Sequence, residues 1–118
     1  MRVRQEVRKT LLAQRRDLFR QVAQTEEELL WLETDVESEV EERGQEENMV
    51  QWLDRMDVRM KIQIEAIDRA LVKVESGQYG RCEVCGKDIP PSRLEVLPSA
   101  AMCLSCAEAW EAQTAVKA

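Results

Sequence analysis

Hydrophobic residues recur at helical spacing along the first third of the chain. An apolar stripe advances about 3.7 residues per step and is interrupted only by Gln14 and Thr25. Since this segment holds neither Gly nor Pro, the pattern predicts one helix from about residue 2 to about residue 41. Such a helix would be roughly 55–60 Å long. The stripe consists of Val3, Val7, Leu11, Leu18, Val22, Leu29, Leu32, Val36 and Val40.

A second apolar stripe follows at about 3.6 residues per step, again the period of a helix. We expect this helix to end at Ser76–Gly77, because Gly77 suits the left-handed conformation that closes many helices. Its members are Met49, Leu53, Met56, Met60, Ile64, Ile67, Leu71 and Val74.

A short polar link, residues 42–45, separates the two stripes, and a short link favours antiparallel neighbours. A turn near residue 42 would place Leu11 near Val74 and Trp31 near Trp52, so apolar positions would meet along the hairpin. Two alternatives stay open. The helices could pair with a second chain instead, and the two tryptophans could contact a partner rather than thicken the seam.

The composition changes after Gly77. Residues 78–106 contain all four cysteines, all three prolines and two of the glycines, which is typical of a compact loop-rich module. The sequence of residues 104–117 predicts a short helix, with Trp110 packed on the module. The predicted fold class is mainly α. It consists of a long antiparallel helical hairpin (an intramolecular coiled coil) over residues 1–77, with a four-cysteine zinc-finger module and C-terminal helix over residues 78–118.

The sequence has no stretch of about 18 apolar residues and no apolar core behind its basic N-terminus. We therefore expect a cytoplasmic protein with no membrane span and no secretion signal.

The cysteines stand as C-x2-C, seventeen residues, C-x2-C, at Cys82, Cys85, Cys103 and Cys106. Two thiolate pairs on two tight turns make a closed tetrahedral site, which zinc prefers in a structural role. Two disulfides or an iron–sulfur centre are the alternatives. A full shell of four thiolates leaves no open coordination position, and the chain has no histidine, so no enzymatic activity is expected.

Charge is distributed unevenly along the chain, whose formal net charge is −6. Residues 1–20 sum to +5, residues 25–47 to −10, and the remainder is close to neutral. Carboxylates such as Glu37, Glu39, Glu41 and Glu42 crowd the end of the first predicted helix, where the helix dipole disfavours them. Stability alone does not explain this, which favours a function at the acidic turn. A solvated turn is the alternative. For the basic residues of the first helix, a solvated helix face is favoured over contact with an acidic protein surface.

The segment GQYGRCEVCGKDIPPSRLEVLP, followed by MCLSC, resembles the DksA/TraR family of bacterial RNA polymerase regulators. The preceding hairpin and its acidic turn match the family as well. The resemblance implies that the hairpin tip enters the secondary channel of RNA polymerase without binding a specific DNA sequence, and we expect the protein to act as a monomer. It implies one structural Zn2+ and no catalytic residues.

The resemblance also implies site residues. The family's tip pattern D-x-x-D-x-A aligns with Glu39, Glu42 and Gly44, so the carboxylates are kept and the alanine is replaced. Arg59 and Arg93 correspond to basic positions that face the polymerase.

Positions that hold guanosine tetraphosphate in the main members correspond to Ala66, Leu97 and Ala107, none of which can neutralise a phosphate. We therefore expect weak or no synergy with that nucleotide. A competing interpretation of the whole chain is a zinc-stabilised coiled-coil adaptor unrelated to transcription.

Overall fold

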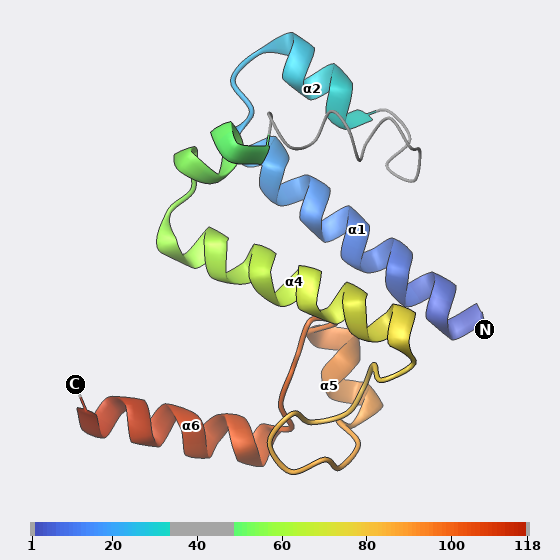
Figure 1. Cartoon of the computed structure of the whole chain (residues 1–118), viewed down its shortest axis with the longest axis vertical. Helices are drawn as coiled ribbons and strands as arrows, with labels where there is room; N and C mark the ends of the chain where they lie inside the picture. Colours follow the sequence, from blue (N-terminus) through green and yellow to red (C-terminus); the bar gives the residue numbers. More distant parts are fainter. Residues whose placement is uncertain (1, 34–48, 118) are drawn as a thin grey trace. The chain divides into compact units, whose positions relative to one another are not determined.

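The structure is a computed structural model that describes residues 2–33 and 49–117. Its named helices are α1 (Arg2–Val22), α2 (Glu26–Glu33), α4 (Val58–Ser76), α5 (Pro91–Val96) and α6 (Leu104–Lys117), and residues 49–55 are also helical (Figure 1). The described residues contain no β-strand, only an isolated bridge between Arg81 and Asp88. The mainly helical class predicted from the sequence is confirmed. None of the described helices is long and apolar enough to cross a membrane.

The chain divides into two compact units, and each has its own buried side chains. Unit 1 contains residues 1–11 and 66–118, and unit 2 contains residues 12–65. In unit 1 the buried apolar side chains are those of Leu11, Ile67, Ala70, Val74, Cys82 and Ile89. In unit 2 they are those of Leu18, Phe19, Leu32, Trp52, Met56 and Ile64. The predicted division at residue 77 stays a prediction.

The predicted continuous helix from residue 2 to residue 41 is wrong, because α1 ends at Val22 and α2 begins at Glu26. A capping box causes the break. The Glu28 N–H donates to Thr25 Oγ1 at 3.0 Å, and Glu28 Oε2 accepts from the Thr25 N–H at 3.0 Å. The spacing of apolar residues does not reveal this break, because the capping-box pattern consists of polar residues. Residues 34–41 of the prediction lie outside the described part of the chain.

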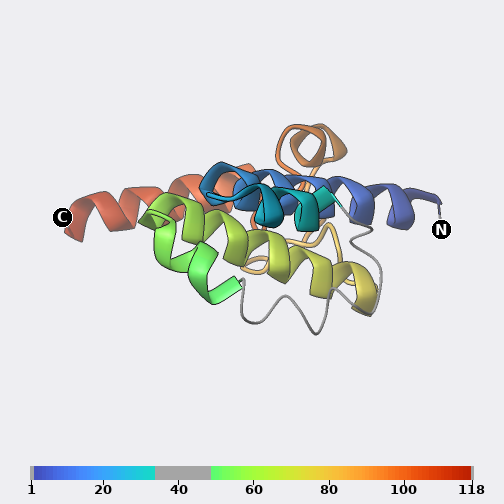
Figure 2. The same cartoon turned by 90° about the horizontal axis from the view of Figure 1, so that it is seen from above.

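The second predicted helix is also interrupted, at Met56 and Asp57. Asp57 caps α4, because its Oδ1 accepts a hydrogen bond from the Met60 N–H at 2.9 Å. Figures 1 and 2 both show the chain changing direction between residues 49–55 and the start of α4.

The helix α4 ends at Ser76, as the sequence predicts. Gly77 has φ +77°, and the N–H groups of Gly77 and Gln78 donate to Val74 O and Lys73 O. This is the Schellman pattern that a glycine after a helix favours.

In unit 2 the breaks let the chain fold back along α1. Residues 49–55 run parallel to the end of α1, since Arg15 contacts Met49, the ring of Phe19 lies 5.0 Å from that of Trp52, and Arg55 donates to Val22 O. The helix α2 runs antiparallel to residues 49–55, since Glu28 contacts Arg55 and Trp31 contacts Trp52. The predicted proximity of Trp31 and Trp52 is confirmed, with ring centroids 5.9 Å apart.

In unit 1 the start of α1 lies beside the end of α4, as the antiparallel prediction requires. Arg4 and Arg8 both pair with Glu75, at 3.5 and 3.4 Å, and Leu11 and Val74 are both almost fully buried. Beyond the loop-rich segment, α6 carries Trp110, whose exposed fraction of 61% means that its predicted packing on the module is partial.

Candidate functional site

Each cysteine pair stands on a turn held by backbone hydrogen bonds. In the first turn the Cys82 N–H donates to Lys87 O at 2.8 Å and the Gly86 N–H donates to Cys82 O at 3.0 Å. Gly86 has φ +75°, a conformation that side chains disfavour, so glycine suits this position. Cys103 precedes α6 and Cys106 lies in its first turn. The Glu83 N–H donates to Ala101 O at 2.9 Å and so ties the two turns together.

The four sulfur atoms, from Cys82, Cys85, Cys103 and Cys106, lie within 4.8 Å of one another. The sulfurs of Cys85 and Cys103 are 3.8 Å apart. A tetrahedral zinc site with Zn–S bonds of about 2.3 Å has sulfur–sulfur edges of about 3.8 Å, so this pair already has the required separation. None of the four forms a disulfide. The donor set therefore fits zinc, and the metal would hold the two turns together.

The thiols differ in acidity because of their neighbours. The hydrogen bond from the Cys85 backbone N–H is the main cause that lowers the pKa of the Cys82 thiol to about 6. Hydrogen bonds with the Cys103 and Cys82 side chains raise the pKa of the Cys106 thiol to about 12. Four adjacent sulfurs thus resist complete deprotonation unless a cation compensates their charge, and Zn2+ supplies that charge when bound.

An ion pair joins the first cysteine turn to α4. Glu83, between Cys82 and Cys85, lies 2.6 Å from Lys73 Nζ and 3.5 Å from Arg69 Nε. The hydrogen bond from Lys73 is the main cause that lowers the pKa of Glu83. The sequence pattern does not predict this contact. An acidic residue directly after the first cysteine was the available signal, but its partner lies ten residues earlier, on another element.

The other predicted residues have separate locations. Arg59 is exposed on α4, whereas Arg93 on α5 is half-buried and its Nε donates to Met102 O at 3.0 Å. Ala66 and Ala107 are half-buried and Leu97 is 45% exposed. The tip residues Glu39, Glu42 and Gly44 lie outside the described residues.

Comparison with known proteins identifies the cysteine module. Residues 77–111, which include all four cysteines, match the family described as "Prokaryotic dksA/traR C4-type zinc finger". Together with the sulfur geometry, this match shows that the chain carries a zinc finger with one structural zinc site.

The similarity to known proteins extends beyond the cysteine module. The structure of transcription factor DksA2 from Pseudomonas aeruginosa aligns with a TM-score of 0.60 and 30% identity, covering 94% of this chain and 84% of that one. The Escherichia coli "RNA polymerase-binding transcription factor DksA" is 39% identical over 67 residues, which are 57% of this chain and 44% of the relative. An uncharacterized protein of Aquifex aeolicus is 45% identical over 51 residues, 43% of this chain and 35% of the relative.

The aligned segments therefore span less than half the length of these two curated relatives. The fold-wide match to DksA2 shows that the chain belongs to the DksA/TraR family, a family of transcription factors whose Escherichia coli member is named for binding RNA polymerase.

Proposed function

We propose that this chain is a cytoplasmic transcription regulator that binds RNA polymerase directly, as a monomer, and reads no DNA sequence itself. The observation that carries the proposal is the likeness to DksA2 over 94% of the chain. The four-cysteine cluster supports it, because the zinc finger is the part that the matched family describes.

The proposed mechanism places the acidic tip in the secondary channel of the polymerase. Glu39 and Glu42 act there as tip effectors, on a basic channel wall or a bound metal ion, and Gly44 gives the tip more backbone freedom than the family's alanine. The charge of −10 over residues 25–47 supports a basic or metal-bearing target and argues against nucleic-acid phosphates. Arg59, exposed on α4, and Arg93 are the proposed polymerase contacts.

Insertion has a structural requirement in unit 2. The segments on either side of the tip both contact α1 in the structure: residues 49–55 lie along its end, and α2 is joined to it by the Arg20–Glu33 ion pair. A long reach requires them to swing away from α1 at residues 23–25 and 56–57, where the helices are already interrupted. The proposal therefore includes an opening step before or during channel entry.

The zinc module has a structural role in this proposal. A closed four-thiolate shell offers neither water nor substrate a coordination position, so we assign no catalysis to it.

In vitro transcription on a ribosomal-type promoter tests the proposal, combined with pull-down of purified polymerase. The Glu39→Ala, Glu42→Ala double variant should bind polymerase but change promoter output much less than the unmodified protein. The Glu26→Ala, Glu27→Ala double variant is the matched control, because it removes two exposed carboxylates from α2 and should act as the unmodified protein does.

Equal effects from the tip variant and the unmodified protein would overturn the tip assignment. Failure to recover the large polymerase subunits would overturn the proposal itself and favour the adaptor interpretation.

A further inference from the structure

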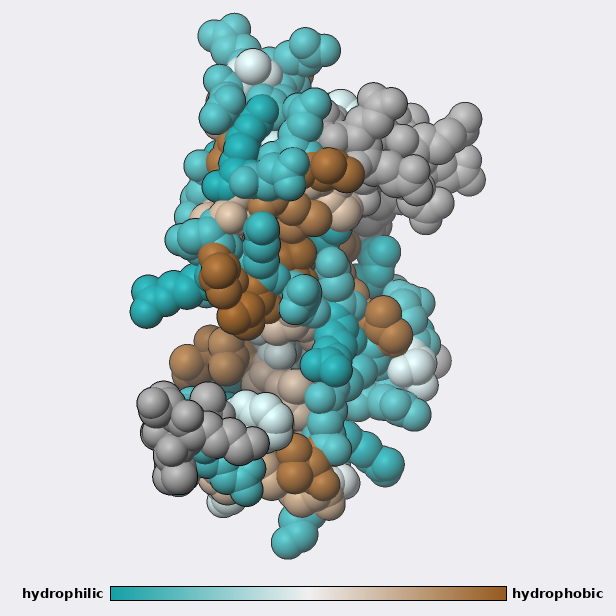
Figure 3. All heavy atoms as spheres, turned by 60° about the vertical axis from the view of Figure 1, so that its left-hand side comes forward, coloured by the Kyte–Doolittle hydropathy of each residue, from teal (hydrophilic) through white to brown (hydrophobic). Residues whose placement is uncertain are grey.

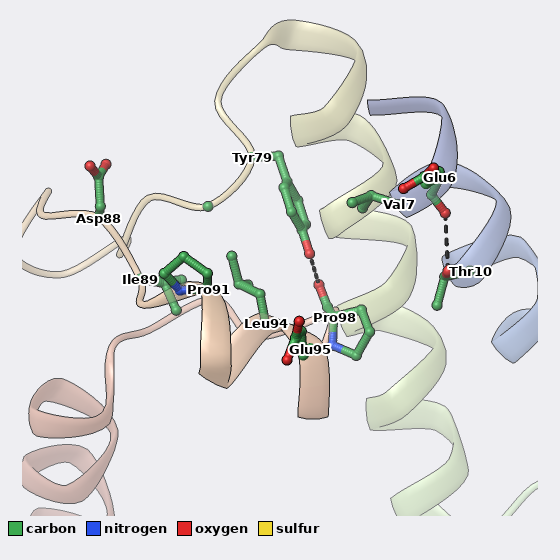
Figure 4. A pocket seen from close by; sticks show the side chains of 11 residues that line it. Glu6, Val7, Thr10, Tyr79, Asp88, Ile89, Pro91, Leu94, Glu95 and Pro98 are labelled. Carbon is green, nitrogen blue, oxygen red and sulfur yellow. Dashed lines mark hydrogen bonds between the residues drawn. The ribbon is translucent and has the colours of Figure 1, made fainter. Parts of the chain in front are cut away.

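Unit 1 contains a hollow of about 690 Å3 between the start of α1 and the loop-rich module (Figure 4). This volume lies in the range of ligand sites in proteins, about 300–1,000 Å3. Its lining comes from α1, from residues 79–80 and 88–89, and from α5 with the residue Pro98 that follows it. It is separate from the zinc site, since none of the cysteines lines it.

The wall of the hollow is apolar and held in place. Ile89 is 2% exposed, and the Tyr79 hydroxyl donates to Pro98 O at 2.7 Å, which fixes the orientation of the ring. Leu94 packs against the backbone of Gly80, where an added Cβ would lie 3.6 Å from Leu94 Cδ1. The wall therefore exists before any ligand arrives.

The rim of the hollow is acidic. Glu6, Asp88 and Glu95 line it, all three are exposed, and no lysine or arginine is among the lining residues. Across the described residues, none of the three is in an ion pair.

Three cations on the helices that line the hollow are engaged elsewhere. Arg4 and Arg8, on the same helix as Glu6, pair with Glu75, and Arg93, two residues before Glu95, bonds to Met102 O. Arg81 and Lys87 are exposed close to Asp88, but in the described part of the chain neither forms an ion pair with a rim carboxylate, so these carboxylates stay available to a partner.

We propose that this hollow binds a short segment of a protein partner that carries an arginine beside an apolar residue. An exposed ion pair contributes only about 0.2–1 kcal/mol, so the rim alone would hold a small free cation weakly. An arginine stem adds apolar contact with the wall, and its planar guanidinium stacks on an aromatic ring such as Tyr79 while it pairs with carboxylates. The proposal concerns this surface alone and does not depend on the partner being RNA polymerase.

The test uses the full-length, zinc-loaded chain and an acetylated, amidated Leu-Arg-Leu-Arg peptide as the probe. We expect saturable binding by fluorescence anisotropy of the labelled peptide, with NMR amide shifts concentrated at Gly80, Leu94 and their neighbours. The same peptide with citrulline, which is neutral and nearly isosteric, should bind at least about fivefold more weakly, since it loses two ion pairs.

Variants locate the interaction. Glu6→Gln with Glu95→Gln should weaken binding by a similar factor, while circular dichroism confirms that the fold is kept. Glu108→Gln with Glu111→Gln is the control, because it removes two exposed carboxylates of α6 that do not line the hollow, and its affinity should be unchanged.

Three results would overturn the proposal. The first is equal affinity for the arginine and citrulline peptides, and the second is an equal loss of affinity in both double variants. The third is competition by spermidine with a dissociation constant as low as that of the peptide. The last would assign the hollow to a free polyamine instead of a protein segment.

Discussion

Among single residues, Glu28 connects three pieces of unit 2. Its Oε2 accepts hydrogen bonds from the Gln24 and Thr25 backbones, and its Oε1 accepts from Trp52 Nε1 and Arg55 Nη1, both at 2.8 Å. Burial alone would raise the pKa of Glu28. The hydrogen bonds from Gln24, Arg55, Trp52 and Thr25 outweigh burial and lower this pKa from 4.5 to about 2. The carboxylate form therefore stabilises the folded state.

Glu28 makes stability depend on pH in a defined direction. Because its pKa is lower in the folded than in the unfolded chain, the stabilisation is complete above pH 4.5 and is lost as the pH falls toward 2. We expect Glu28→Gln to lower the free energy of unfolding at pH 7 by roughly 1–3 kcal/mol and to flatten its pH dependence below pH 4.5. Urea unfolding at several pH values measures both effects. Glu27→Gln, an exposed neighbour on α2, is the control, and an equal loss in both variants would contradict the role of Glu28.

A second residue-scale prediction concerns the nucleotide effector. Ala66, Leu97 and Ala107 have no charged group to bind a phosphate. Added guanosine tetraphosphate should therefore give weak or no synergy with the proposed effect of this protein on promoter output in purified transcription reactions. Polymerase alone with the nucleotide provides the baseline, and a clear gain beyond the sum of the two separate effects would contradict the prediction.

At the scale of elements, apolar spacing predicted the two main helical regions and the antiparallel pairing in unit 1. It predicted neither where the helices break nor α5, which lies in the segment expected to be loop-rich. Val22 and Leu29 are seven residues apart, about two helical turns, so spacing alone gives no sign of the break between them. The signals for the breaks are local and polar, namely the T-x-x-E pattern at Thr25 and the aspartate at residue 57. The zinc ligands were predictable because cysteine spacing alone identifies such a site. The Glu83–Lys73 pair was not, because it depends on how α4 meets the module.

The start of α4 depends on its cap. Replacing Asp57 by Ala removes the acceptor for the Met60 N–H, which should destabilise unit 2 by about 1 kcal/mol. Amide hydrogen exchange should increase at residues 58–61 before it changes elsewhere. Asp54→Ala, at an exposed position of the helical residues 49–55, should leave exchange at α4 unchanged. Similar exchange at α4 in both variants would show that the cap does not define this end.

At the scale of the whole molecule, the two units should respond differently to metal removal. Unit 1 contains the cysteine turns, whose loop-rich backbone buries few side chains, mainly Cys82 and Ile89, and this segment is too small to fold without its metal. Unit 2 has the Phe19–Trp52 contact and the Glu28 network, neither of which involves zinc.

A strong chelator should therefore release one zinc ion per chain and expose residues 78–118 to limited proteolysis, while α1 and α4 stay helical by circular dichroism but melt at a lower temperature. Cys82→Ser should reproduce this state without chelator, and Ser105→Ala, an exposed change inside the second cysteine pair, should not. Melting that ignores the chelator at equilibrium would be incompatible with a structural zinc, because a metal bound only to the folded state must stabilise it.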